Sequence, residues 1–124
     1  MTVKVAEVAR QVVGVQTFID IGTNTGGVDL LLEAGGFSFL QGTVDTPLSS
    51  YDAAKDVWWR LRESGGTLFF ETSADGATWT MKGQTADPPG LDAVQVTIGA
   101  GAYRATSMPG TAEFRCYNLP AGCE

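Results

Sequence analysis

The sequence predicts an all-β fold in which antiparallel strands form a sandwich or a barrel. Apolar and polar residues alternate with a period of two rather than 3.6, which is typical of half-buried strands. Sixteen glycines and five prolines interrupt the apolar runs with turn signals such as AGG, SGG and DPPG. Such short turns favour antiparallel neighbours. The 124 residues are enough for one domain with a hydrophobic core, and we assign residues 1–124 to it.

The apolar runs give the expected strands in chain order. We expect them at Val3–Ala9, Val15–Ile21, Val28–Glu33, Phe37–Gly42, Val57–Glu63, Thr67–Thr72, Trp79–Gln84, Ala93–Ile98, Tyr103–Thr106 and Ala112–Tyr117. The segment SSYDAAKD, residues 49–56, is the exception, because it favours a short helical turn with Ser49 or Ser50 as N-cap. The stretch GAGAYR lacks the third glycine of a dinucleotide fingerprint and is predicted to connect strands.

Composition excludes several classes of function. With 14 acidic and 8 basic residues the net charge is −6, so we expect the chain to repel nucleic acid. Its apolar runs are too short for membrane insertion. The absence of histidine excludes Ser-His-Asp and Cys-His nucleophiles and every zinc site that needs histidine. We therefore predict a protein that is not an enzyme and has no cofactor and no metal.

The stretch VWWRLRESGGTLFFETSADGATW, residues 57–79, predicts a β-hairpin. Gly65 and Gly66 suit the two positions of a type I′ turn that require positive φ. The resulting register pairs Trp58 with Ser73, Trp59 with Thr72, Arg60 with Glu71, Leu61 with Phe70 and Arg62 with Phe69. One face then carries the residues that we expect in the core, namely Trp59, Leu61, Leu68 and Phe70.

The other face of this hairpin carries the candidate carbohydrate-binding residues Trp58, Arg60, Arg62, Phe69 and Glu71. Aromatic rings can stack on a sugar, while guanidinium and carboxylate groups bind its hydroxyls. The alternative is structural: Arg60 and Glu71 form a cross-strand ion pair, and a neighbouring strand, loop or subunit covers Trp58 and Phe69. A glycosidase would need a second carboxylate beside Glu71, and none is evident.

The segment SADGATW, residues 73–79, is one residue shorter than the Asp-box S-x-D-x-G-x-T-W, because Asp75 directly precedes Gly76. It occurs once, whereas a propeller needs several blades. We therefore expect a tight turn in which the Asp75 side chain bonds nearby backbone.

Two further groups of residues leave alternatives open. Cys116 and Cys123, the only cysteines, either form a disulfide across the C-terminal turn or remain as a buried and a free thiol. Asp20, Asn24 and Asp29 around GTNTGG either stabilise a turn or offer oxygens to calcium, although their spacing is not that of an EF-hand.

Three motifs follow one another along the second half of the chain: YDAAKDVWWRLRESGGTLFFETSADGATWT, LDAVQVTIGAGAYRA and GTAEFRCYNL. From about Tyr51 to Leu119 this order resembles the concanavalin A-like lectin/glucanase jelly-roll domain of actinobacterial proteins and of actinophage minor tail proteins. The resemblance implies an antiparallel β-sandwich in a short version, because family domains usually have additional N-terminal strands. The paired acids of the glucanase members are not recognisable, so no catalytic residue carries over.

The resemblance implies a phage virion structural protein, a minor tail or surface subunit that is assembled in the host cytoplasm and binds host-surface glycan. We expect a homo-oligomer in contact with other virion proteins, with residues 1–13 as an arm or exchanged strand. Charges interrupt MTVKVAEVAR where a secretion signal would be apolar. The alternative is a free-standing carbohydrate-binding, lectin-like module of a bacterial protein, which would be extracellular.

Overall fold

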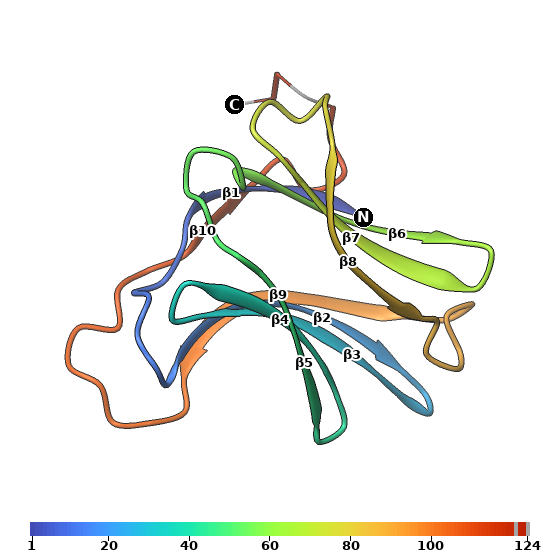
Figure 1. Ribbon diagram of the computed structural model, residues 1–124, viewed down its shortest axis with the longest axis horizontal. Helices are drawn as coiled ribbons and strands as arrows, with labels where there is room; N and C mark the ends of the chain where they lie inside the picture. Colours follow the sequence, from blue (N-terminus) through green and yellow to red (C-terminus); the bar gives the residue numbers. More distant parts are fainter. Residues whose placement is uncertain (121, 124) are drawn as a thin grey trace. The chain divides into compact units, whose positions relative to one another are not determined.

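The computed structural model describes residues 1–120, 122 and 123, and the regular elements of this part are all β-strands (Figure 1). They form two antiparallel five-stranded sheets, ordered β10-β1-β6-β7-β8 and β5-β4-β3-β2-β9. The strands are β1 (Thr2–Glu7), β2 (Val15–Thr23), β3 (Gly26–Glu33), β4 (Gly36–Gln41), β5 (Val44–Ser50), β6 (Trp58–Ser64), β7 (Thr67–Ser73), β8 (Thr80–Ala86), β9 (Gln95–Ala102) and β10 (Glu113–Arg115). The predicted fold class, all-β of the antiparallel β-sandwich type and compatible with a jelly roll, is confirmed.

The chain divides into two compact units, each of which holds one sheet. Met1–Glu7, Asp52–Asp87 and Glu113–Glu124 form the first unit, and Val8–Tyr51 and Pro88–Ala112 form the second. In the first unit β1 lies between β10 and β6. Residues 2–7 of the segment expected as an arm or exchanged strand are thus part of a sheet, and exchange of this strand between copies stays a prediction.

The β6–β7 hairpin has the register that the sequence predicts. Leu61 pairs with Phe70 and Arg60 with Glu71, and Gly65 and Gly66 have φ values of 61° and 82°. Alternation then separates the two faces of the hairpin. The four side chains predicted for the core are all buried: Trp59, Leu61, Leu68 and Phe70.

The core side of this hairpin is held by packing of aromatic rings and aliphatic chains. The rings of Trp59 and Phe70 meet edge to face, with centroids 6.1 Å apart, a favourable geometry for aromatic pairs. Val3 and Val5 of β1 are also buried, so the buried face of the first sheet extends across β1, β6 and β7.

The second sheet is built around β2, which pairs with β3 on one side and β9 on the other. Its strands bury alternate residues, as the period of two predicts. The buried side chains on this face are Val15, Thr17, Ile19, Ile21, Val28, Leu30, Leu32, Phe37 and Phe39. Leu31, which is paired with Phe18 and lies on the opposite face, is also buried.

The strand predictions need two corrections, one for a strand that was missed and one for an expected strand that does not form. The sequence prediction missed β5, since Pro47 and Asp45 disfavour strands and most of its residues are exposed. Residues 103–106 form no strand. Instead β9 continues through GAG, because β2 supplies pairing partners as far as Ala102. At Gly99 a Cβ would lie 3.0 Å from Cζ of Phe18, so the glycine leaves room for that ring.

The segment expected to be helical forms a single turn. Backbone nitrogens of Lys55 and Asp56 donate to the Asp52 carbonyl at 3.0 and 2.8 Å. Asp52 acts as the cap, since its Oδ1 accepts from the nitrogen of Ala54 at 2.9 Å. Ser49 and Ser50, the predicted caps, lie in β5. Within the described residues, no helical segment has the length and hydrophobicity that a bilayer crossing requires.

The paired Leu61 and Phe70 give the first testable prediction. Leu61→Ala and Phe70→Ala should each lower the free energy of unfolding by about 2–5 kcal/mol, because each leaves a cavity in the buried face. Urea denaturation measures this. Val44→Ala, at a position that is 64% exposed, is the control and should change stability by less than about 0.5 kcal/mol. Losses as small as the control in both core variants would show that the assigned face is wrong.

Candidate functional site

The outer face of the β6–β7 hairpin holds a cluster in which two arginines bind one carboxylate. Nε of Arg60 donates to Oε2 of Glu71 at 2.6 Å. Arg62 donates from Nε to Oε2 at 3.3 Å and from Nη2 to Oε1 at 3.0 Å. These bonds follow from the register, which places Glu71 directly opposite Arg60 and diagonal to Arg62.

Each arginine of this cluster also lies over an aromatic ring. Cζ of Arg60 is 4.1 Å from the ring centroid of Trp79, and Cζ of Arg62 is 4.6 Å from that of Phe69. Both distances are within the range of cation–π attraction. The sequence prediction did not include Trp79, although the SADGATW motif contains it. We call Arg60, Arg62, Phe69, Glu71 and Trp79 the arginine cluster.

The electrostatics of the arginine cluster keep Glu71 ionised. Burial alone would raise the pKa of Glu71, but hydrogen bonds from Arg62 and Arg60 and their charges outweigh it, so this pKa lies below its usual value. The same bonds raise the pKa of Arg62. Only 10% of the Glu71 side chain is exposed, against 27% and 42% for Arg60 and Arg62. The two arginine side chains are therefore more accessible to solvent than Glu71, which holds them in place.

Trp58, the fifth predicted site residue, lies on the same face but is buried, with 4% exposure. It is paired with Lys4 of β1 and Ser73 of β7. The Trp58 ring could contact a sugar only if the groups that bury it moved away. The structure thus brings Arg60, Arg62, Phe69 and Glu71 together around Trp79, and it places Trp58 beneath the surface.

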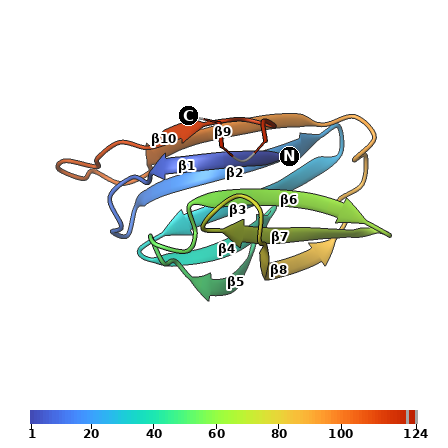
Figure 2. The same ribbon diagram turned by 90° about the horizontal axis from the view of Figure 1, so that it is seen from above.

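Further cations extend this face across the sheet. Strand β1 lies between β6 and β10 (Figure 2). Its Lys4 pairs with Trp58 of β6 on one side and with Arg115 of β10 on the other, so these three residues share a face. Arg115 donates from Nε to Glu113 at 2.6 Å. Within the described part of the chain Lys4 has no carboxylate partner. The face carries four cations (Lys4, Arg60, Arg62, Arg115) and three carboxylates (Glu71, Glu113 and Glu7, which is paired with Glu113), an excess of one positive charge on a chain of net charge −6.

The SADGATW segment forms the predicted turn. Oδ1 of Asp75 accepts from the backbone nitrogens of Ala77 and Thr78 at 2.8 Å each and from Oγ of Ser73 at 2.9 Å. Bonds from Thr78, Ala77 and Ser73 lower the pKa of Asp75 to about 2. Gly76 has a φ of 75°. The turn ends just before Trp79, which lies under Arg60.

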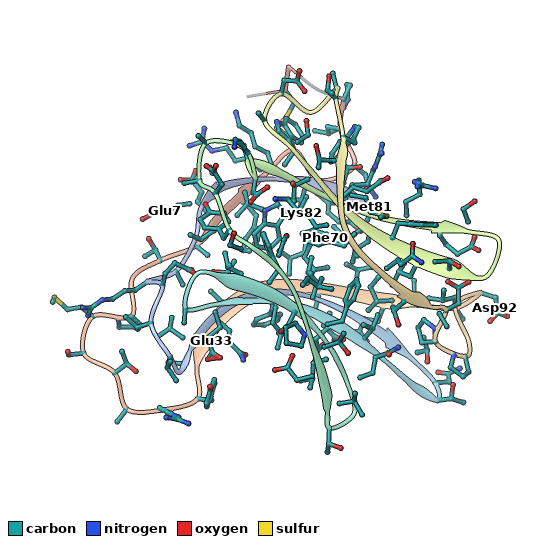
Figure 3. The ribbon with its side chains drawn as sticks, viewed as in Figure 1. Glu7, Glu33, Phe70, Met81, Lys82 and Asp92 are labelled. Carbon is teal, nitrogen blue, oxygen red and sulfur yellow. A yellow bond between two sulfur atoms is a disulfide. The ribbon has the colours of Figure 1, made fainter. Side chains whose placement is uncertain are left out.

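A buried ion pair that the sequence did not reveal lies at the β8 end of the first sheet. Asp56 is fully buried, and its Oδ1 accepts from Nζ of Lys82 at 2.9 Å and from Oγ1 of Thr72 at 2.6 Å. Lys82, labelled in Figure 3, also lines a cavity of about 240 Å³ with Lys55, Asp75 and several hydroxyls. A buried charge needs a partner of opposite charge and hydrogen bonds for its remaining polar atoms. Asp56 has both, because it pairs with Lys82 and accepts hydrogen bonds on each of its carboxylate oxygens.

The oxygens considered for calcium are not all brought together. Asp20 and Asp29 lie directly opposite each other on β2 and β3, beside a cavity of about 280 Å³. Asn24 lines a different cavity, with Val94 and Gln95. Within residues 1–120, 122 and 123, no group of three or more His, Cys, Asp or Glu side chains is placed to hold a metal ion.

The two cysteines form the disulfide that the sequence left open. Cys116 and Cys123 are joined, with their Cα atoms 5.9 Å apart. The adjoining tail is fastened to β1, because Oδ1 of Asn118 accepts from the nitrogen of Thr2 at 2.9 Å and the Asn118 nitrogen donates to the Thr2 carbonyl at 2.7 Å.

Comparison of the chain with protein-family models, with curated proteins and with solved structures finds no match.

The Asp20–Asp29 pair predicts how stability depends on pH. Burial, with a hydrogen bond to Asp20 and its charge, raises the pKa of Asp29 to about 6. The folded state therefore binds the proton more tightly than the unfolded state, and stability falls as pH rises from about 4 to 6. Asp29→Asn should remove this fall and stabilise the protein at pH 7 by roughly 1 kcal/mol, a figure that allows for solvent screening.

Urea melts between pH 4 and 7 measure this effect. Asp45→Asn is the matched control, because Asp45 lies opposite Leu40 rather than opposite a carboxylate. If the stability of the wild type and that of Asp29→Asn depended on pH in the same way, the account of the Asp20–Asp29 pair would be contradicted.

Proposed function

We propose that this chain is a structural subunit of a phage virion, a minor tail or surface protein of the concanavalin A-like jelly-roll kind, and that it binds host-surface glycan. The binding surface is the outer face of β6 and β7, centred on the arginine cluster. The subunit performs no chemistry on the glycan, because cleavage of a glycosidic bond uses two carboxyl groups and Glu71 is held between Arg60 and Arg62.

The observation that carries this proposal is that some hydrogen-bond donors of Arg60 and Arg62 hold Glu71 while others are left for a ligand. Within the described residues, the Nη atoms of Arg60 and Nη1 of Arg62 bond no acceptor, while the other donors hold Glu71. Each guanidinium is also held over a ring. A ligand acceptor would thus meet preorganised donors, which reduces the entropic cost of binding.

The charge of the face indicates the class of glycan. Lys4 and Arg115 extend the positive surface from the arginine cluster to β10. Guanidinium groups bind carboxylate and phosphate by paired hydrogen bonds. An acidic glycan, with carboxylate or phosphate groups along its chain, fits this surface better than a neutral one.

A free-standing extracellular carbohydrate-binding module is the second candidate function. The Cys116–Cys123 disulfide favours it, because disulfides persist in oxidising surroundings and are rare in the cytosol. Both candidates use the same binding face, and they differ in whether the chain assembles with itself and with other virion proteins.

Calorimetric titration with polygalacturonate, and with dextran as the neutral polymer, tests the binding face. We expect polygalacturonate to bind and dextran to bind more weakly. Arg62→Gln should weaken binding at least about tenfold, because it removes a charged hydrogen-bond donor. Lys4→Gln should also weaken binding, and both effects should shrink in high salt.

Arg104→Gln supplies the matched control, since it removes the same charge from the second unit. It should leave affinity unchanged, and circular dichroism should show all variants folded. The proposal fails if the wild type binds neither polymer, or if Arg104→Gln weakens binding as much as Arg62→Gln.

A further inference from the structure

Each sheet ends in two edge strands, and these four edges differ in how they are protected. The edges are β10 and β8 in the first sheet and β5 and β9 in the second. An unprotected edge offers a row of backbone donors and acceptors to another strand, and natural proteins usually block it with proline, charges, bulges or short length.

Three of the four edges carry such protection. β5 contains Pro47, which has no N–H, and Asp45, and its pairing with β4 is interrupted by a bulge. β8 has a bulge opposite β7 and an inward-pointing charge at Lys82, whose side chain is 15% exposed. β10 has three residues, two of them charged.

The remaining edge, β9, carries none of these devices. Its sequence QVTIGAGA has no charge and no proline. It pairs with β2 over all eight residues without a bulge, so its far edge is straight and regular. Within the described part of the chain, no backbone group of β9 bonds any strand other than β2, and none of its residues is buried. About half of its peptide groups therefore point outward without a protein partner.

We propose that β9 pairs with β9 of a second copy of this chain, antiparallel and about a two-fold axis, to join two five-stranded sheets into one. The other edges of this chain are unsuited to the role because of Pro47, Lys82 and the short β10. On a chain of net charge −6, β9 is the edge that brings no like charges face to face.

The side chains of β9 suit this self-pairing. A two-fold axis at Gly99 places Val96 opposite Ala102, Thr97 opposite Gly101 and Ile98 opposite Ala100. Each larger side chain then meets a small one, and the two Gly99 residues meet at the axis. The contact is isologous, so it closes after two copies.

This inference rests on the assembly role in the proposed function and does not depend on glycan binding. Sedimentation equilibrium of the purified chain, from micromolar to millimolar concentration, measures the monomer–dimer equilibrium. Thr97→Lys and Ala100→Lys, both at exposed positions of β9, should raise the dissociation constant of the dimer at least about tenfold by placing like charges near the axis. Thr46→Lys, at an exposed position of β5, should leave it unchanged.

Amide hydrogen exchange of the wild type adds a readout without substitution, since amides of β9 should become protected as concentration rises. A wild type that stays monomeric throughout, or a dimer that both lysine variants leave intact, would overturn the inference. A monomer that still binds polygalacturonate would overturn it while leaving the glycan-binding proposal standing. A β9 dimer that binds no polymer would support the inference and overturn the glycan-binding proposal.

Discussion

The pairing of Leu61 with Phe70 is the constraint on which the first unit depends. Gly65 and Gly66, both with positive φ, close the hairpin in two residues and leave one register. Because side chains alternate, a slip by one residue would turn Arg60 and Arg62 toward the buried side and Trp59 toward solvent. The Gly65-Gly66 turn therefore determines which side chains of the hairpin lie in the core and which lie on the outer surface.

The free energies of apolar burial and of ion pairing show which of the two faces contributes more to the stability of the hairpin. Burial of a large apolar side chain contributes about 1.5–3 kcal/mol, and Trp59, Leu61, Leu68 and Phe70 are all buried. Partly exposed ion pairs contribute at most about 1 kcal/mol each. The arginine cluster is thus a consequence of the register rather than its cause. Its donors can therefore serve a ligand with little loss of stability.

The features that local sequence determines could be predicted, and those that depend on distant residues could not. The hairpin register followed from two glycines and the apolar alternation. Strand β5 was missed because Pro47 weakens its local signal, while β4 pairs with it nonetheless. The extension of β9 through Gly99 depends on Phe18 and β2. Trp79 reaches Arg60 only after the Asp75 turn has formed, so its part in the site required the fold.

The central claim is that the register of β6 and β7 creates a surface that binds acidic glycan. NMR titration of the labelled chain with polygalacturonate fragments tests it most directly, because the indole N–H of Trp79 and the Nε–H groups of Arg60 and Arg62 give separate signals. The account predicts that these signals and the amides of β6 and β7 shift most. Shifts centred on the second unit, with the signals of Arg60, Arg62 and Trp79 unchanged, would contradict it.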